Sequence, residues 1–352
     1  MAELRAAVIG YGLAGSVFHA PLIAATPGLK VSTVVTGNPE RQAAASRAYP
    51  DSTVASNTDE IFERAGDHDF VVVAAPNDVH ATLTRKALDV GLPVVVDKPL
   101  APTADEARSL VEHGEELGVP VTVFMNRRWD SDQLTLRRLL EEGRLGKVLR
   151  YESRFERWRP ALSEPRAWRE TSPPEVGGGI LLDLGSHLVD QAVILFGEVE
   201  RVYAEVENQR GGSADDDVFL ALEHGSGVRS HLWASQLAAS PGPRLRVLGD
   251  RAAYVINDVD GQEQALVSGA RPGDKGWGAE PREKWGRLIS EQGSEPIASE
   301  SGDWPRFYSQ LERALRQGSP PPVDARDAIT GLEILDAARR SASTGTVVSL
   351  AP

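Results

Sequence analysis

The stretch Ala6-Ala7-Val8-Ile9-Gly10-Tyr11-Gly12-Leu13-Ala14-Gly15 joins a short apolar run to a glycine-rich turn. Its glycines follow the pattern G-x-G-x-x-G, which is weak by itself because glycines gather in many turns. Here an apolar strand precedes the turn and a helical pattern follows it, so a dinucleotide-binding loop is favoured over a structural turn. In such a loop the first glycine permits a tight turn, the second lets the backbone approach a pyrophosphate, and the third lets helix and strand pack closely. We expect cofactor contacts from Gly10, Tyr11, Gly12, Leu13, Ala14 and Gly15.

Outward from this loop, residues 1–124 alternate short β-branched runs with helical stretches. Because the runs are almost wholly apolar, they predict parallel strands that helices bury on both faces. The fold class is therefore α/β, with an N-terminal Rossmann domain built on a doubly wound parallel sheet. The expected strands are 6–9, 31–35, 70–73, 94–96 and 119–123, and the expected helices are 17–25, 39–48, 58–64, 80–90 and 103–117.

Residues 125–352 have a different pattern, in which runs with a period of two follow one another without intervening helices. Such runs indicate a C-terminal α+β domain with a large, mainly antiparallel open sheet. The C-terminal helix of this second domain could pack back on the first. The expected strands are 149–158, 199–206, 218–223 and 228–233, the expected helices include 131–142 and 185–196, and 271–286 and 290–305 are expected to be loops.

The composition excludes several classes of protein. A chain of 352 residues is long enough for two domains, and 38 basic against 51 acidic residues give a net charge of −13. This charge disfavours nucleic acid as a partner, and the absence of cysteine excludes disulfides and thiolate metal sites. No apolar run approaches the length of a membrane span, and no signal peptide is evident. We expect a soluble cytoplasmic protein that acts on a small molecule.

The residues after the second expected strand bear on the choice of cofactor. NAD-selective sites usually place a carboxylate there, but this chain has Thr36, Asn38 and Arg41. These side chains could bind a 2′-phosphate through hydroxyl, amide and guanidinium donors, so NADP is favoured and NAD remains possible. The alternative is that Arg41 lies on a solvated helix face while Glu40 turns inward.

The turn after the third expected strand should also border the cofactor, because ligands bind beyond the carboxyl ends of parallel strands. Pro76, Asn77 and His80 occupy this turn, and the latter two are candidates for contact with the nicotinamide ribose. Alternatively, Asn77 or Asp78 caps the helix that follows.

A lysine between a buried strand and a proline is the strongest signal after the glycines. Asp97 and Lys98 end the run Val94–Val96 and precede Pro99. Beside a nicotinamide, the Lys98 ammonium could polarise a substrate oxygen, so we predict a catalytic role for Lys98 and cofactor contact from both residues. The alternative is a structural pair between Lys98 and Asp97.

The second concentration of reactive groups lies after a run of three glycines. Asp183 and His187 are four residues apart, so they share one face if the segment is helical. Imidazole takes up and releases protons near neutrality, which suits removal of an alcohol proton. A zinc site lacks a third ligand at suitable spacing, and Ser186 lacks the context of a nucleophile, so we predict no metal.

Together Gly10–Gly15, Asp97-Lys98-Pro99 and Asp183–His187 resemble the Gfo/Idh/MocA oxidoreductase family over nearly the whole chain. The resemblance implies a Rossmann domain, a C-terminal α/β domain whose open sheet commonly forms a homodimer or homotetramer, and catalytic roles for Lys98, Asp183 and His187. Asp97 stands where the family usually has Glu, which keeps the charge.

Within the family, several further segments resemble NADP-dependent scyllo-inositol dehydrogenases. The similarity implies oxidation of a secondary hydroxyl of a cyclic polyol. Donors and aromatic faces suited to a sugar-like ring, with Asp183 and His187 beside them, are expected from Asn126, Arg127, Trp129, Arg166 and Trp168. Alternatively, Arg127 pairs across the domain interface and Trp129 belongs to the core.

Two other functions stay open at this point. An aldose or other sugar dehydrogenase would share the same catalytic groups. A dinucleotide-sensing protein without activity would keep the glycines, but it would not need Lys98 and His187.

Overall fold

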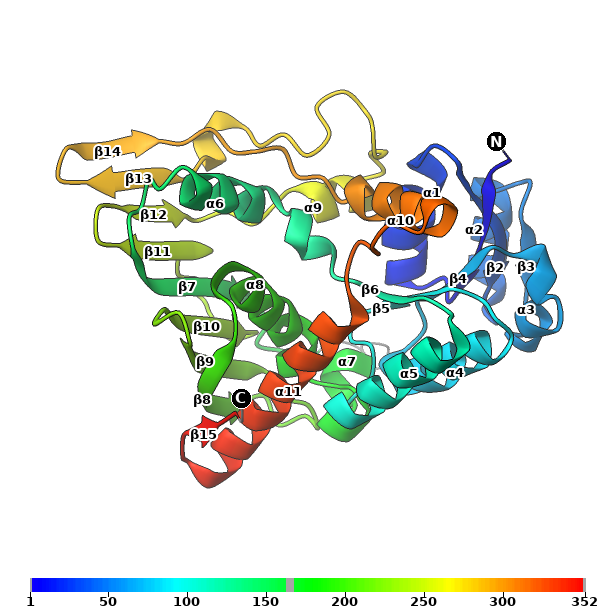
Figure 1. Ribbon diagram of the computed structural model, residues 1–352, viewed down its shortest axis with the longest axis horizontal. Coiled ribbons are helices and arrows are strands. Elements are labelled where there is room, and N and C mark those ends of the chain that lie inside the picture. The colour runs from blue at the N-terminus through cyan, green and yellow to red at the C-terminus, as the bar shows by residue number, and fades with distance from the viewer. Residues whose placement is uncertain (1, 163–167, 351–352) are drawn as a thin grey trace.

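A six-stranded parallel sheet forms the N-terminal half of the molecule (Figure 1). The computed structural model describes residues 2–162 and 168–350. The strand order is β3-β2-β1-β4-β5-β6. The direction in which successive strands are added to the sheet therefore reverses between β1 and β4, and a dinucleotide fold binds its ligand at this point. The strands are β1 (Leu4–Ile9), β2 (Leu29–Val35), β3 (Thr53–Ala55), β4 (Phe70–Val73), β5 (Val94–Asp97) and β6 (Val121–Phe124).

Helices cover both faces of this sheet, as its buried valine-rich strands require. All four residues of β4 are buried, as are all four of β5. The doubly wound prediction is thereby confirmed, with β3 as an additional strand. The helices are the π-helical turn η1 (Ala14–His19), α1 (Ala20–Ala25), α2 (Pro39–Ala48), α3 (Asp59–Glu63), α4 (His80–Asp89) and α5 (Ala104–Leu117).

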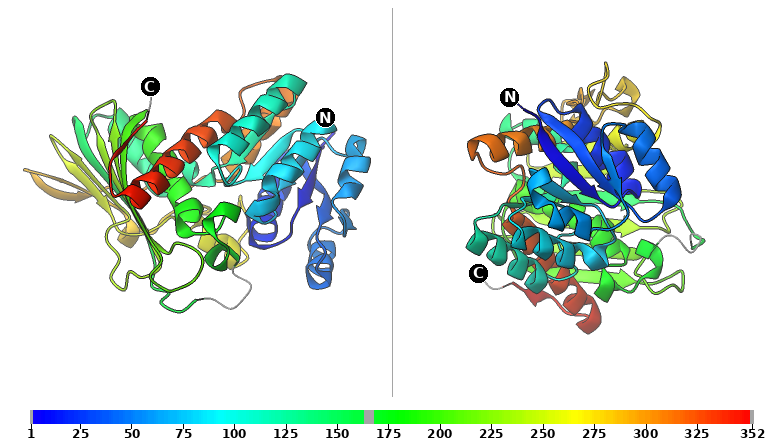
Figure 2. Two further views of the ribbon diagram at one scale, coloured as in Figure 1. Left: turned by 90° about the horizontal axis from the view of Figure 1, so that it is seen from below. Right: turned by 90° about the vertical axis from the view of Figure 1, so that its right-hand side faces the viewer.

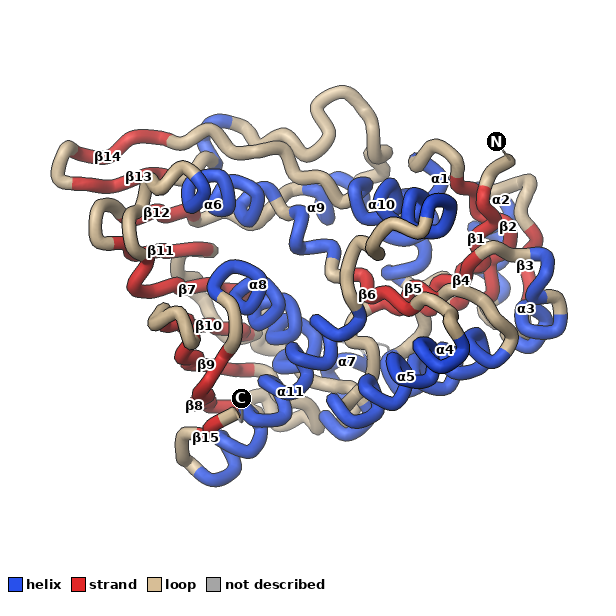
Figure 3. The backbone as a smooth tube through the Cα atoms, viewed as in Figure 1, coloured by secondary structure: helices blue, strands red, loops and turns tan. Residues whose placement is uncertain are grey.

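A nine-stranded sheet forms the other half, separate from the first in the molecule (Figure 3). Its order is β14-β13-β12-β11-β7-β10-β9-β8-β15. Most pairs are antiparallel as expected, but β7 and β10 are parallel, so the sheet is mixed. The strands are β7 (Val148–Glu156), β8 (Val199–Glu207), β9 (Asp217–His224), β10 (Arg229–Ser235), β11 (Leu245–Gly249), β12 (Ala253–Ile256), β13 (Arg287–Ser290), β14 (Gly293–Pro296) and β15 (Val348–Ser349).

The prediction of a loop over 290–305 was partly wrong, because β14 lies there and pairs with β13. Its sequence Gly-Ser-Glu-Pro has no apolar alternation, and all four residues are exposed at the sheet edge. Backbone hydrogen bonds with β13 hold this edge strand in place. Because such bonds do not depend on apolar side chains, the sequence carries no hydrophobic pattern that would predict the strand.

Helices cover one face of the nine-stranded sheet, and Figure 2 shows the opposite face bare. β9 alternates strictly between half-buried and buried residues, as this one-sided cover predicts. The covering helices are mainly α8 (Ser186–Phe196) and α11 (Ala325–Thr344), with α6 (Ser131–Glu141) beside them, and the remaining helices are α7 (Trp168–Thr171), α9 (Gln262–Val267) and α10 (Pro305–Gln317).

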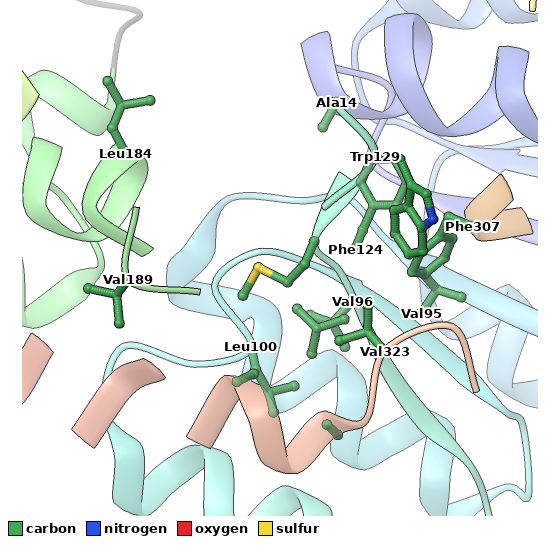
Figure 4. Close-up of a cluster of buried hydrophobic side chains, with 14 of the residues drawn as sticks. Ala14, Val95, Val96, Leu100, Phe124, Trp129, Leu184, Val189, Phe307 and Val323 are labelled. Atoms are coloured by element: carbon green, nitrogen blue, oxygen red, sulfur yellow. The ribbon is translucent and has the colours of Figure 1, made fainter. Parts of the chain in front are cut away.

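The C-terminal chain returns to the first sheet. α10 contacts α1, and α11 lies between α5 and β8. Between α10 and α11, the Val323 carbonyl accepts a hydrogen bond of 2.7 Å from the buried Thr122 hydroxyl of β6. Val323 also joins the core cluster that contains Leu100, Phe124 and Phe307 (Figure 4). The C-terminal chain therefore contacts both the elements of the first sheet and those of the second. None of the described helices is long and apolar enough to cross a membrane.

Candidate active site

A cavity of about 870 Å³ lies where the carboxyl ends of the parallel strands meet the second sheet. The glycine loop after β1, Lys98 after β5, and Asp183 and His187 near the start of α8 all line it. Three segments that are far apart in the sequence thus contribute to one space, as their motifs predict. Its size suits a ligand larger than a single sugar ring.

The glycine loop is shaped for close backbone contact. Gly10 has a φ of +96°, and a Cβ there would lie 2.4 Å from the Ala74 carbonyl oxygen. A Cβ on Gly15 would lie 1.9 Å from the Gly10 carbonyl oxygen. The loop can therefore pack against the start of the helix only because residue 15 has no side chain. Gly12 faces the cavity, where only the Arg41 guanidinium comes within 4 Å of such a Cβ, at 3.7 Å. This cradle fits the pyrophosphate of a dinucleotide.

Side chains after β2 and β3 line the cavity beside this loop. They include the predicted Thr36 and Arg41, together with Ser56 and Thr58, which sequence reasoning missed. None of the described lining residues between positions 35 and 60 carries a carboxylate. Asn38 is not a lining residue. Its side chain caps α2 by accepting a hydrogen bond of 3.0 Å from the Arg41 amide.

The turn after β4 contributes Pro76 to the cavity, whereas Asn77 and His80 are buried behind it. The Asn77 amide donates to the Gly177 carbonyl at 2.8 Å, which ties this turn to the segment before α8. The His80 ring lies 2.7 Å from the Pro99 carbonyl and 2.9 Å from that of Ala75. These contacts place both side chains behind the cavity wall, which they help to hold in place, and cofactor contact by Asn77 and His80 stays a prediction.

Lys98 is joined to Asp183 across the cavity. Its ammonium donates at 2.6 Å to the Asp183 carboxylate and at 2.6 Å to the Asp183 main-chain carbonyl. The carboxylate of Asp97 accepts from the Lys98 amide at 3.0 Å, so Asp97 steadies the backbone while the lysine side chain reaches forward. The alternative of a side-chain pair between Lys98 and Asp97 is not what the structure shows.

His187 lies in the first turn of α8 and is 4% exposed. Burial lowers the pKa of His187 well below its ordinary value, and the nearby charges of Lys98 and Arg127 act in the same direction, against that of Asp183. The imidazole is therefore neutral at physiological pH and able to accept a proton. The π-helical turn η6 (Leu181–Gly185) precedes α8 and carries Asp183 into the same cavity.

The pKa of His187 leads to a pH prediction for alcohol oxidation. Its protonated form cannot accept a proton, so activity falls as the pH drops through its pKa, which lies below 6.5. We expect kcat/KM to stay level as the pH is lowered through 6.5 and to fall only in more acidic buffer. Initial rates over a pH series measure this, and an acidic limb centred at or above 6.5 would contradict it.

Among the substrate candidates, Asn126 and Arg127 line the cavity. The Arg127 guanidinium donates to Glu263 at 2.7 Å and to Asp130 at 3.3 Å, and these carboxylates raise its pKa despite complete burial. Its charge is thus already balanced by these two carboxylates. Arg127 can still offer its remaining donors to a ligand.

The structure corrects the prediction for Trp129. This side chain does not line the cavity but lies in the core, edge-on to Phe307 with ring centroids 6.1 Å apart (Figure 4). Its place in the core follows the alternative interpretation. Arg166 and the side chain of Trp168 lie outside the described part of the molecule.

Further polar residues line the cavity although none of them was among the predicted site residues. Glu263 comes from α9, Arg157 and Gln236 follow β7 and β10, and Arg210 follows β8. Each is a common residue type, and only the pairing of distant strands brings them together. Within the described ranges, no three His, Cys, Asp or Glu side chains are grouped so that they could hold a metal ion.

Models of a known protein family match most of this chain. The model of the Gfo/Idh/MocA oxidoreductase family for the NAD-binding Rossmann fold matches residues 4–125, and its model for the C-terminal α/β domain matches residues 137–350.

Full-length relatives agree with the family match. IolW of Bacillus subtilis, a scyllo-inositol 2-dehydrogenase (NADP(+)), is 33% identical over 99% of this chain and 96% of its own length. YdgJ of Escherichia coli, described as an uncharacterized oxidoreductase, is 38% identical over 99% of both chains.

Solved structures are similar over the same extent. The oxidoreductase YvaA of Bacillus subtilis superposes with a TM-score of 0.93 at 32% identity, over 99% of both chains. An oxidoreductase from Klebsiella pneumoniae gives 0.89 at 36% identity, over 99% of this chain and 95% of its own. With both domain models matched in order and relatives similar from end to end, the chain belongs to the Gfo/Idh/MocA oxidoreductase family.

Proposed function

We propose that this protein transfers a hydride between NADP(H) and a secondary hydroxyl of a cyclic polyol, with scyllo-inositol as the substrate. The observation that carries the proposal is the meeting of Lys98, Asp183 and a neutral His187 in the cavity that the glycine loop opens. The similarity to an NADP-linked scyllo-inositol dehydrogenase supports the substrate class. We place the division between the cofactor and substrate domains at residues 124 and 125, directly after β6.

The three catalytic residues have different tasks in this proposal. His187 accepts the hydroxyl proton, because burial keeps its imidazole neutral. The ammonium of Lys98 stabilises the oxygen as negative charge develops on it, and Asp183 holds that ammonium in place at 2.6 Å. When bound, the nicotinamide supplies the hydride acceptor in oxidation and the donor in reduction. Reduction of the ketone uses the same groups in reverse, with His187 returning the proton.

The cofactor preference rests on the side chains after β2 and β3. Arg41, Thr36 and Ser56 offer positive charge and hydroxyl groups where an NAD enzyme usually presents a carboxylate. A 2′-phosphate gains charge-assisted hydrogen bonds from such a site. We therefore propose NADP as the preferred cofactor.

An absorbance assay tests function and cofactor together. Purified protein is mixed with NADP or NAD and a panel of inositols and aldoses, and reduced nicotinamide is followed. We expect NADP reduction with scyllo-inositol, and we expect Arg41→Ala to raise KM for NADP about tenfold, the effect of losing one ionic hydrogen bond, with little change for NAD. Activity with NAD alone would overturn the cofactor proposal, and cofactor binding without turnover of any compound would favour a sensor.

A sugar dehydrogenase is the second candidate function. D-apiose dehydrogenase of Paraburkholderia graminis is 28% identical over 80% of this chain, and D-xylose 1-dehydrogenase (NADP(+)) 2 of Haloferax volcanii is 27% identical over 80%. Turnover of aldoses but not of inositols in the same panel would establish this alternative.

We also propose a homodimer or homotetramer formed through the nine-stranded sheet. Its bare face (Figure 2) carries a half-buried aromatic pair, Phe219 and Trp233, with ring centroids 5.1 Å apart, and the Arg154 guanidinium lies 3.8 Å from the Trp233 ring. Aromatic and arginine side chains are typical of interface cores. Sedimentation equilibrium should give at least twice the chain mass of 37.9 kDa, and a monomer at micromolar concentration would contradict this.

A further inference from the structure

Two polar side chains enter the cavity from neighbouring strands of the second sheet. β7 and β10 run parallel, with Ser235 opposite Glu156, so Arg157 and Gln236 follow at the same level. The Arg157 amide donates to the Ser235 carbonyl at 2.8 Å, which continues the ladder one step past the strand ends. Both side chains line the cavity.

The alternation of the strands sends these side chains toward the cavity. Ser153 and Phe155 of β7 are buried on the face that the helices cover, and Arg157 is the next residue of that series. In β10, Leu232 and Ala234 are likewise buried on the covered face, and Gln236 is the next residue of that series. A pair of sheet positions therefore delivers Arg157 and Gln236 side by side.

The hydrogen-bonding capacity of this pair is unused within the described part of the protein. Gln236 is 6% exposed, and its buried Oε1 atom has no hydrogen-bond partner there. The Arg157 side chain makes no hydrogen bond or ion pair with the described residues. Burial lowers the pKa of Arg157, because it disfavours the charged form. A buried acceptor without a partner is costly in a folded protein, and at a cavity wall, beside the donors of the half-buried Arg157, it favours a ligand that satisfies it.

Three other cations of the cavity wall already have carboxylate partners. Lys98 is held by Asp183, Arg127 by Glu263, and Arg210 by Asp216 at 3.0 Å. Unlike these three, Arg157 has no ion-pair partner among the described residues. The carboxylates of Glu263 and Asp183 act on its charge through space and raise its pKa against the larger effect of burial.

We propose that Arg157 and Gln236 form a second anchoring site for the substrate, which binds a hydroxyl group other than the one being oxidised. A hydroxyl can donate to the Gln236 Oε1 atom and accept from the Arg157 guanidinium at once, whereas a carboxylate has no proton for the glutamine oxygen. The pair therefore favours a hydroxyl group over a carboxylate at this position. This inference rests on the proposed function, because it deepens the substrate class of the same cavity.

Such an anchor would set which ring carbon meets the reacting groups. A ring held only at Lys98 and His187 could rotate about the bound oxygen, and a second contact fixes its orientation. Epimers that place a hydroxyl differently would leave the Gln236 oxygen unpaired and bind less well.

The test combines binding with kinetics. Scyllo-inositol is titrated by calorimetry into the NADP complexes of wild type, Arg157→Met, Gln236→Leu and, as a control, Arg313→Met, an exposed residue of α10. We expect each of the first two variants to raise Kd for the polyol about tenfold or more, the effect of losing one good hydrogen bond, while the Kd for NADP and the control stay within about twofold. KM should rise by a similar factor, with a smaller loss in kcat. D-glucuronate should bind wild type less tightly than scyllo-inositol.

The outcomes separate this proposal from the proposed function. Wild-type turnover with unchanged Kd and KM in both variants would overturn the second anchor and leave the dehydrogenase intact. Tight binding of D-glucuronate that depends on Arg157 would show that the site binds a carboxylate rather than a hydroxyl, and would overturn the second anchor as well. Binding that both variants weaken, without turnover by any of the proteins, would support the anchor and overturn the dehydrogenase. No binding of scyllo-inositol by wild type would overturn both.

Discussion

The Lys98→Met variant is expected to lose between about 10² and 10⁴ of kcat, the range that a positioned proton donor or charge contributes. Lys98 is 11% exposed, and its ammonium is the cation that Asp183 holds at 2.6 Å in the cavity. Methionine keeps most of the length and none of the charge, so the substrate oxygen would lose its electrostatic stabilisation in the transition state. Steady-state rates measure kcat, and a fluorescence titration with NADPH shows whether the cofactor still binds.

The control for this variant is Lys86→Met. Lys86 pairs with Asp59 at 2.9 Å, and both side chains are about half exposed. Exposed pairs contribute little, so kcat should stay at the wild-type value. If Lys98→Met bound the cofactor normally and kept its full kcat, the catalytic role of Lys98 would be wrong.

The Gly15→Ala variant should have the second large effect, on both cofactor binding and stability. Its Cβ would lie 1.9 Å from the Gly10 carbonyl oxygen, so the loop must move away from the helix start. Crowding of this kind usually costs about 1–3 kcal/mol of the free energy of unfolding, and the displaced loop no longer fits a pyrophosphate. Urea unfolding with and without NADP measures both effects: the midpoint should fall, and the stabilisation by NADP should disappear.

Gly331→Ala is the matched control, because it makes the same chemical change within α11. Nothing lies within 4 Å of a Cβ at Gly331, and alanine is the better helix former. This variant should unfold at the same urea concentration as wild type or at a higher one. Unchanged stability and NADP binding in Gly15→Ala would contradict the close packing of the loop.

Sequence patterns predicted the first domain better than the second, for a physical reason. Strands such as β4 and β5 are buried on both faces, so they appear as valine runs that nothing else explains. β3 has only three residues, too few for a pattern that can be detected. The parallel pairing of β7 with β10 depends on contacts between residues far apart in the chain, which periodicity does not reveal.

The candidate site shows the same division. Motifs located the residues whose chemistry demands a particular type at a particular spacing, namely the glycine loop, Lys98 and the pair Asp183 and His187. Residues whose task depends on tertiary neighbours were missed or misplaced. Arg157 and Gln236 meet only because their strands are adjacent, and Trp129 faces the core rather than the cavity.

Hydride transfer from a polyol carbon to a nicotinamide inside this cavity is the step on which the proposed function depends. The most direct measurement uses scyllo-inositol deuterated at its ring carbons, with NADP and wild-type protein, and mass spectrometry of the reduced cofactor. We expect NADPH that carries a single added deuterium, and no labelled cofactor with Lys98→Met at the same time point. Unlabelled NADPH, or no reduction of NADP by this polyol, would contradict it.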